Sequence, residues 1–198
     1  MSDIVFVNGD FVPKQDATIS IFDRGFIFGD GVYEVVPVIE GVMVDKDYFL
    51  QRLERSLAEL RIAWPCEPGA VVAMLEQLIA RNALHEGMVY LQITRGIADR
   101  EFNFPANTRS SMIGFVTALQ ILTPSAAETG IAVVSTRDLR WKRRDIKSVN
   151  LLGQVLAKQD ALERGGHEGW MVEDGYVTEG VSSSAYIVRD GTILTRPL

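Results

Sequence analysis

The sequence is poor in the residues from which several common functional sites are built. It contains one cysteine, Cys66, and two histidines, His85 and His167, among 198 residues. A single cysteine excludes an internal disulfide and a cysteine-rich zinc site. Two histidines far apart in the sequence argue against a histidine-rich metal site and against a Ser-His-Asp triad. We therefore expect no metal site.

Long hydrophobic runs and an excess of positive charge are also absent. No apolar stretch approaches the roughly 20 residues that cross a bilayer, and the first residues do not resemble a signal peptide. Lys and Arg number 20 against 26 Asp and Glu, which gives a net charge of −6 and argues against a general affinity for nucleic acid or membrane surfaces. Neither a GxxxxGK[ST] phosphate loop nor a GxGxxG fingerprint occurs. The expectation is a soluble cytoplasmic protein.

The N-terminal segment predicts strands and turns. Asn8-Gly9 separates Ile4–Val7 from Phe11–Val12 and predicts a two-residue hairpin turn, because both turn positions tolerate positive φ. β-branched residues over Val32–Ile39 predict a longer strand. Within it, Pro37 cannot donate a ladder hydrogen bond, so this strand should lie at an edge or contain a bulge.

Two helices and two more strands should complete an N-terminal domain of residues 1–120. Asp47 is the expected N-cap of the first helix, and Pro68 suits the first turn of the second. Strands are expected over Val89–Thr94 and Met112–Leu119.

A second domain, residues 121–198, should begin where the composition changes to Thr, Pro, Ser and Ala around Gln120–Glu128. A strand over 131–136, a basic loop, a helix over 149–164 and two hairpins are expected there. The predicted fold class is therefore α+β, with mixed sheets in two domains. The residues of the 149–164 helix expected to face inward are Leu152, Val155, Leu156 and Leu162.

One lysine, Lys147, lies between the basic loop and the apolar helix. A solvated surface residue is the commonest interpretation of a single lysine. The alternative is an amine nucleophile kept uncharged by a dry environment and by neighbouring cations, here Arg143 and Arg144. The spacing alone favours the surface interpretation.

A carboxylate, Glu179, follows a predicted hairpin strand and precedes three serines at 182–184. A solvated glutamate in a turn is again the commoner interpretation. A carboxylate has a specific task, however, in sites where a lysine binds the aldehyde of a pyridoxal cofactor. There it keeps the nitrogen of the cofactor's pyridine ring protonated, so that the ring can accept electrons.

Four motifs in order resemble those of one enzyme family. RDIKSVNLLGQVLAKQDA and VTEGVSSSAYIV are similar to the two central motifs of the class IV (fold-type IV) aminotransferases, which depend on pyridoxal 5'-phosphate. FDRGFIFGDGVYEVVPV and YLQITRG, with REFNFP downstream, resemble the N-terminal motifs of the D-amino-acid aminotransferase branch. Family chains normally continue past this point, so the resemblance implies a C-terminally truncated chain whose second domain is incomplete.

The resemblance implies roles for individual residues around the cofactor. Lys147 matches the lysine that forms the Schiff base and transfers the proton. Glu179 matches the partner of the pyridine nitrogen, and Arg52 matches an arginine that holds the cofactor phosphate. Ser182 and Ser183 match a serine run near the cofactor.

The resemblance also implies a substrate site. Tyr33 and Arg100 match two residues that bind the α-carboxylate, and a guanidinium suits this group because its planar fork donates two parallel hydrogen bonds. In the family this arginine comes from the neighbouring subunit, as does a tyrosine matching Tyr90, which implies a homodimer with shared active sites. One position differs, because D-amino-acid enzymes commonly have a histidine two residues after the arginine and this chain has Phe102.

The implied reaction is transamination between a D-amino acid, such as D-alanine, and a 2-oxo acid, such as 2-oxoglutarate. Within the same fold the alternatives are a branched-chain L-amino-acid aminotransferase, an aminodeoxychorismate lyase, and an (R)-amine transaminase, which Phe102 favours. A non-catalytic module is the alternative if the truncation is native. A nucleic-acid role for the basic run 137–144 is disfavoured by the acidity of the chain.

Overall fold

The computed structural model describes residues 3–123 and 126–196, which divide into two compact units. The first unit is Met1–Pro124 with Asp145–Val149, and the second is Ser125–Arg144 with Asn150–Leu198. The division expected at residue 120 places the segment around Lys147 in the second domain. By its contacts this segment lies with the first unit, because Ser148 forms a bridge with Val32 in the long strand of that unit.

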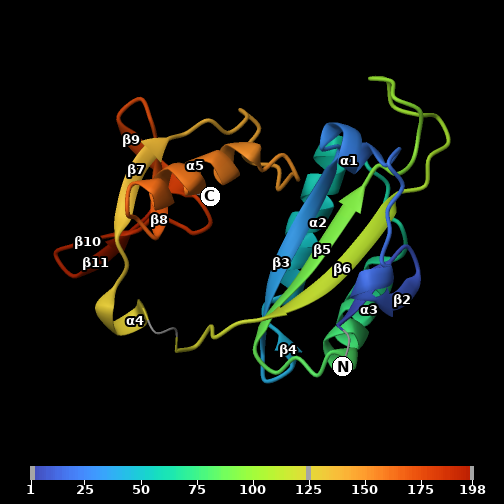
Figure 1. Ribbon diagram of the computed structural model, residues 1–198, viewed down its shortest axis with the longest axis horizontal. Helices are drawn as coiled ribbons and strands as arrows, with labels where there is room; N and C mark the ends of the chain where they lie inside the picture. Colours follow the sequence, from blue (N-terminus) through green and yellow to red (C-terminus); the bar gives the residue numbers. More distant parts are fainter. Residues whose placement is uncertain (1–2, 124–125, 197–198) are drawn as a thin grey trace. The chain divides into compact units, whose positions relative to one another are not determined.

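The first unit is built on a six-stranded antiparallel sheet in the order β2-β1-β6-β5-β3-β4 (Figure 1). The expected hairpin joins β1 to β2, with Asn8 at φ 50° and Gly9 at φ 117°. The expected edge or bulge at Pro37 is wrong, because β3 lies between β5 and β4 and its pairing is regular. Pro37 is tolerated because β4 pairs with β3 only at Val38 and Ile39, so the side of Pro37 that lacks an N–H faces no strand residue of β4. The strands are β1 (Ile4–Val7), β2 (Asp10–Pro13), β3 (Gly31–Ile39), β4 (Val42–Met43), β5 (Gly87–Thr94) and β6 (Ser111–Ala118).

Two helices, α2 (Lys46–Leu60) and α3 (Pro68–Arg81), cover one face of this sheet. The register places Glu34, Leu91 and Gly114 side by side across β3, β5 and β6, and a Cβ on Gly114 would meet Leu75 and Leu78 of α3. The side chains between the sheet and the helices form the main core, because alternate strand residues point to the same face. The buried members include Val32, Val36, Leu53, Leu57, Val71, Leu75, Leu78, Val89, Leu91 and Ile93.

The helix starts were predicted with mixed success. Pro68 is the first residue of α3, as expected. The expected N-cap Asp47 is wrong, because α2 begins at Lys46 and Asp47 lies in its first turn. Asp45 occupies the cap position instead, in a left-handed conformation and without a side-chain capping bond. Two short helices complete the unit, η1 (Lys14–Asp16) and α1 (Arg24–Phe28).

The second unit contains a three-stranded mixed sheet in the order β7-β8-β9. The strands β7 and β8 are parallel and are connected through α5, because parallel neighbours need a crossover, whereas β8 and β9 form an antiparallel hairpin. The hairpin turns expected at Asp174-Gly175 and Asp190-Gly191 are both present with positive φ. The elements are α4 (Ala126–Thr129), β7 (Val133–Arg137), α5 (Leu152–Glu163), β8 (Glu168–Glu173), β9 (Tyr176–Gly180), β10 (Ile187–Arg189) and β11 (Thr192–Leu194).

The prediction for the inward face of α5 is wrong. The buried residues of this helix are Ala157 and Ala161, and Ala161 lies 3.4 Å from the position that a Cβ on Gly169 of β8 would take. Small residues on both sides let the helix approach the sheet closely. The four large side chains that were expected inside are at least half exposed, namely Leu152, Val155, Leu156 and Leu162.

Within residues 3–123 and 126–196, no helix combines the length and the apolar composition needed to cross a bilayer. The longest, α2, has 15 residues.

Candidate functional site

Lys147 lies in a short segment that runs along β3 at the end away from β4. The Tyr33 N–H donates to the Lys147 carbonyl at 3.0 Å, and the Val149 N–H donates to the Gly31 carbonyl at 3.1 Å. On the helix side, the Lys147 N–H donates to Ser56 Oγ of α2 at 3.4 Å. The backbone of Lys147 is therefore fixed by both β3 and α2.

The Lys147 side chain is half-buried and rests on an aromatic ring. Its Nζ atom lies 4.3 Å from the centroid of Tyr33. Among the described residues no carboxylate forms an ion pair with it. An ammonium group over a ring is stabilised by the ring quadrupole, but the amine is not committed to a counter-ion. The Nζ atom of Lys147 is therefore open to a ligand.

Aromatic side chains continue from Tyr33 across the open face of the sheet. The rings of Tyr33 and Tyr90 stack at 5.7 Å, and those of Tyr90 and Phe115 stack at 4.6 Å. The Tyr90 hydroxyl donates to Gln92 Oε1 at 3.0 Å. Burial, followed by the nearby Tyr33 phenol, raises the pKa of Tyr90 to about 12. Tyr90 is therefore a neutral hydrogen-bonding group at physiological pH. A cleft of about 350 Å³ opens nearby, and Gln92 and Val149 are among the residues that line it.

Arg52 pairs with a buried carboxylate that the sequence analysis did not identify. Glu34 of β3 is completely buried, and Arg52 donates to its two oxygens from Nε at 2.9 Å and from Nη2 at 2.5 Å. These hydrogen bonds hold the pKa of Arg52 above its ordinary value. The alternation Val32-Glu34-Val36 in a strand with one apolar face could have indicated this carboxylate. Arg52 precedes Ser56 by one turn of α2, so both lie on the helix face beside the Lys147 segment.

Arg100 lies apart from this group, in the long loop between β5 and β6. It is exposed, and its guanidinium carbon lies 5.7 Å from the centroid of Phe28 and 5.6 Å from that of Phe102. The Phe102 side chain is 81% exposed. Within one chain the structure thus brings Lys147, Tyr33 and Tyr90 together, whereas Arg100 belongs to a different cluster in the same unit.

In the second unit, Glu179 lies at the end of β9 in a tight turn. Its Oε1 atom accepts hydrogen bonds from the backbone N–H groups of Gly180 at 3.3 Å and Ala185 at 3.0 Å. A Cβ on Gly180 would collide with the carbonyl and hydroxyl oxygens of Ser183, so only glycine fits this turn. Among the described residues no group donates to Oε2, and this oxygen is available to a ligand.

The two candidate serines share a second carboxylate that the sequence analysis also missed. Ser182 Oγ donates to Glu168 Oε2 at 2.6 Å, and Ser183 Oγ donates to the same oxygen at 3.2 Å. Burial opposes the charge on Glu168, but hydrogen bonds from Ser182 and the Gly169 N–H lower its pKa below the ordinary value. The serine hydroxyls are thus oriented by Glu168, the first residue of β8.

The basic loop before Lys147 is tied to acidic residues of its own unit. Arg144 donates to Glu173 at 2.7 Å and lies 3.5 Å from Asp138, and Lys142 donates to Glu173 at 2.9 Å. Asp138 also accepts from Thr178, the residue before Glu179, at 2.6 Å. The charge of Arg144, expected to act on Lys147, is therefore offset by two carboxylates.

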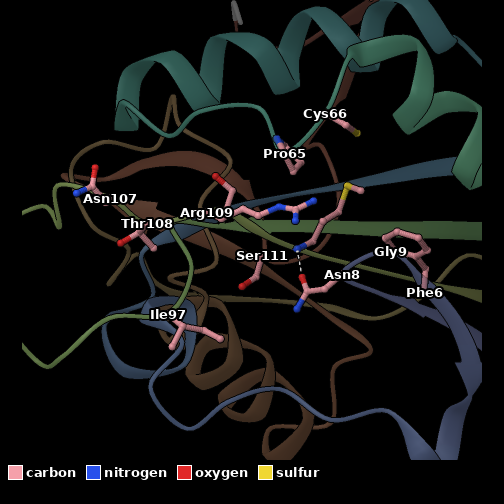
Figure 2. A pocket seen from close by; sticks show the side chains of 12 residues that line it. Phe6, Asn8, Gly9, Pro65, Cys66, Ile97, Asn107, Thr108, Arg109 and Ser111 are labelled. Atoms are coloured by element: carbon pink, nitrogen blue, oxygen red, sulfur yellow. Dashed lines mark hydrogen bonds between the residues drawn. The ribbon is translucent and has the colours of Figure 1, made fainter.

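A separate cleft of about 470 Å³ in the first unit contains none of the candidate residues. Figure 2 shows Arg109 lying across it from the β5–β6 loop, with Cys66 and Gly9 at its margins. The Asn8 side-chain oxygen accepts a hydrogen bond from the Met112 N–H at 2.8 Å on one wall. Burial raises the pKa of the Cys66 thiol, which makes this cysteine a weak nucleophile.

Comparisons with known proteins identify related sequences. The family model described as amino-transferase class IV matches residues 31–198. The chain is 36% identical over 194 residues to D-alanine aminotransferase of Staphylococcus epidermidis. The aligned region covers 98% of this chain and 69% of that enzyme. It is 34% identical over 194 residues to D-alanine aminotransferase of Bacillus licheniformis, with 98% and 68% covered. The chain therefore spans somewhat more than two thirds of the length of these relatives.

Comparisons with solved structures establish the fold. The branched-chain amino acid aminotransferase of Escherichia coli matches with a TM-score of 0.88 at 22% identity, covering 98% of this chain and 68% of that one. The branched-chain aminotransferase of the archaeon Thermoproteus uzoniensis, solved with norvaline, matches with a TM-score of 0.83 at 18% identity, covering 100% and 69%. The predicted fold class is confirmed. On the family match and the relatives above 30% identity, this chain belongs to the class IV aminotransferases.

Proposed function

We propose that this aminotransferase exchanges the amino group of a D-amino acid, such as D-alanine, with a 2-oxo acid, such as 2-oxoglutarate. The observation that carries the proposal is the similarity to D-alanine aminotransferases over 98% of the chain. The two branched-chain aminotransferase structures described above are only 22% and 18% identical to this chain, so their similarity supports the fold and not the substrate.

Class IV aminotransferases use pyridoxal 5'-phosphate, which supplies an aldehyde for an amine and a pyridinium ring that stabilises negative charge at the substrate α-carbon. The side chains described above fit this group. Over the part of the chain that the structure describes, no carboxylate pairs with the Lys147 amine and no group donates to the second oxygen of Glu179. Arg52 uses Nε and Nη2 for Glu34, which leaves Nη1 for a phosphate oxygen.

In the proposed reaction these side chains have distinct tasks. Lys147 Nζ would hold the cofactor by its aldehyde carbon. Once the substrate amine has taken that place, the freed amine would accept the α-proton of the substrate and donate a proton to the cofactor carbon on the other side of the shared nitrogen. Glu179, oriented by the Gly180 and Ala185 N–H groups, would keep the ring nitrogen protonated. Ser182 and Ser183, oriented by Glu168, contribute hydrogen bonds near the cofactor.

The substrate carboxylate is assigned to Tyr33, Arg100 and Tyr90. The neutral Tyr90 phenol does not repel a carboxylate, and it can donate to one if it gives up its hydrogen bond to Gln92. Because Arg100 lies in a different cluster from Tyr33 and Lys147 within one chain, we propose that a homodimer supplies Arg100 and Tyr90 to the neighbouring site. Location in the cytoplasm stays a prediction from the composition.

Phe102 favours one second candidate, an (R)-amine transaminase. The phenyl ring of Phe102 gives an apolar surface at the position where a histidine would help to bind a substrate carboxylate. An amine substrate that has no carboxylate would suit this surface.

Three donors tested in parallel would separate the candidates. D-alanine, L-leucine and (R)-1-phenylethylamine are each supplied with 2-oxoglutarate to the purified 198-residue chain loaded with pyridoxal 5'-phosphate. The proposal predicts the highest kcat/KM with D-alanine and appearance of pyruvate and D-glutamate. Preference for L-leucine would reassign the chain to the branched-chain enzymes. A chain that binds no cofactor, and so has no visible absorbance, would be a non-catalytic module.

A further inference from the structure

The backbone next to Arg100 is held by an arginine of α1. Arg24 Nη1 donates to the Glu101 carbonyl oxygen at 2.7 Å. The Arg24 side chain is only 4% exposed, although it lies in a five-residue helix at the surface of the unit. A buried arginine is uncommon unless its charge and its donors are fully used, and one of these donors fixes the residue that follows Arg100.

The same helix also holds the aromatic ring after Glu101. Phe28 lies one turn after Arg24, and the Arg24 guanidinium carbon is 4.7 Å from its ring centroid. The Phe28 and Phe102 rings pack at 5.6 Å, and the Arg100 guanidinium lies within 5.7 Å of each. α1 therefore holds both residues that follow Arg100, one through the backbone and one through a ring.

The orientation of Arg24 is fixed by a carboxylate that two arginines share. Asp30 Oδ2 accepts from Arg24 Nε at 2.8 Å, and Asp30 also accepts from Arg95 Nε and Nη2 at 2.8 and 2.9 Å. Burial opposes the charge on Asp30, but the hydrogen bonds from Arg95 and Arg24 outweigh it and lower its pKa. Arg95 in turn donates to the Leu60 and Arg61 carbonyls at the end of α2. The network thus connects the Arg100 loop to the rigid helix layer.

Other groups hold the loop on either side of its tip, since the Ala98 N–H donates to the Phe22 carbonyl at 3.2 Å and the Arg95 guanidinium carbon lies 3.7 Å from the Phe104 ring centroid. At the tip itself, Glu101 and Phe102 are held by α1. The loop leaves β5 at Gly96, whose φ of 98° is suited to glycine, and it returns past Arg109. The residues of the tip, including Arg100, Glu101 and Phe102, are exposed. An exposed loop of this length opens at low free energy unless specific contacts order it.

We propose that Arg24 is a positioning residue for substrate binding, which holds the Glu101 carbonyl so that Arg100 meets the substrate carboxylate in one orientation. The inference rests on the proposed function, in which Arg100 binds that carboxylate. It adds a role for Arg24, and for Asp30 acting through it, that goes beyond the eight residues assigned above. The competing possibility is that Arg24 only stabilises the fold.

The kinetic test compares two ligands that differ in the carboxylate. Arg24→Met removes both charged hydrogen bonds, and the loss of a charge-assisted contact predicts a KM for D-alanine raised roughly tenfold, with kcat changed less than about threefold. D-alaninol has a hydroxymethyl group in place of the carboxylate, and its Ki as a competitor should not change. Arg81→Met is the matched control, because Arg81 also stacks on a phenylalanine, Phe11, at 4.3 Å, away from the loop. Equal weakening of D-alanine and D-alaninol would mean a structural role only and would overturn the proposal.

A second measurement does not depend on turnover. Hydrogen–deuterium exchange of peptides covering 97–104 should accelerate in Arg24→Met while peptides from α2 and α3 keep their wild-type rates, and Arg81→Met should change neither. Unchanged exchange in this loop overturns the proposal whatever the kinetics are. A wild-type chain without D-alanine turnover would refute the proposed function, and the exchange rates would still decide whether Arg24 orders the loop. If Arg24→Met does not fold, Arg24→Lys and Phe28→Leu provide the same two measurements.

Discussion

Removing Arg52 should destabilise the first unit through the carboxylate it leaves behind. Glu34 is completely buried, and its only described partner is Arg52, whose side chain is 38% exposed. Breaking a buried ion pair by deleting one partner costs about 3–5 kcal/mol. Because Arg52 is partly solvated, we take the lower end, about 3 kcal/mol, for Arg52→Met. For a chain of this size that corresponds to a decrease in Tm of roughly 6–12 °C.

A double variant separates this effect from cofactor binding. In Glu34→Leu with Arg52→Met the buried charge is gone, and replacing a whole buried pair by apolar groups is often neutral, so most of the lost stability should return. If Arg52 also binds the cofactor phosphate, the affinity for pyridoxal 5'-phosphate should stay weak in both variants. Urea denaturation gives the free energy of unfolding, and absorbance titration gives the cofactor Kd.

Two outcomes would contradict this prediction. A loss below about 1 kcal/mol in Arg52→Met would place the pair among surface ion pairs of little energetic value. A double variant as unstable as the single one would show that packing of the arginine stem, and not the buried charge, is what matters. Lys46→Met is the control, since Lys46 lies in the same helix and pairs with Glu76, whose side chain is 51% exposed.

Three further predictions concern the site and the second unit. Lys147→Ala should abolish both turnover and the visible absorbance of bound cofactor, and persistence of both would refute the assignment of Lys147. Ala161→Leu should destabilise the second unit by roughly 1–3 kcal/mol through overpacking, whereas Leu162→Ala should change stability by less than about 0.5 kcal/mol, and urea denaturation of both checks the observed face of α5. Hydrogen bonds from Arg144 and Lys142 lower the pKa of Glu173 from 4.5 to about 2. A depressed pKa means that this stabilisation is complete above about pH 4.5 and is lost as the pH falls toward 2, so Glu173→Gln should flatten the acid limb of a stability–pH curve, and an unchanged limb would contradict the pairing.

Much of the architecture follows from local chemistry in the sequence. The Asn8-Gly9, Asp174-Gly175 and Asp190-Gly191 turns are each where the sequence predicts them, because positive φ at consecutive positions is tolerated by few residues. Pro68 lies at a helix start for an equally local reason. The family, too, was evident from four motifs, and the match over residues 31–198 confirms it.

The errors have a common physical origin in tertiary packing. The pattern of α5 has large apolar residues and small ones on different faces, and hydrophobicity alone favours burying the large ones. The helix instead presents Ala157 and Ala161 to the sheet, where Gly169 permits close approach. The cap of α2 was missed because Asp45 takes a left-handed conformation with no side-chain capping bond, and a sequence signature for capping assumes such a bond.

The sequence by itself determined the turns, the strand and helix types and the family motifs, because each depends on residues close together in the chain. Only the tertiary structure decided which groups act as partners across long separations. Three carboxylates have partners that come from other elements. These are Glu34 with Arg52, Glu168 with Ser182 and Ser183, and Asp30 with Arg24 and Arg95. A buried charge must be compensated wherever the fold brings a donor, and no local spacing specifies which donor that will be.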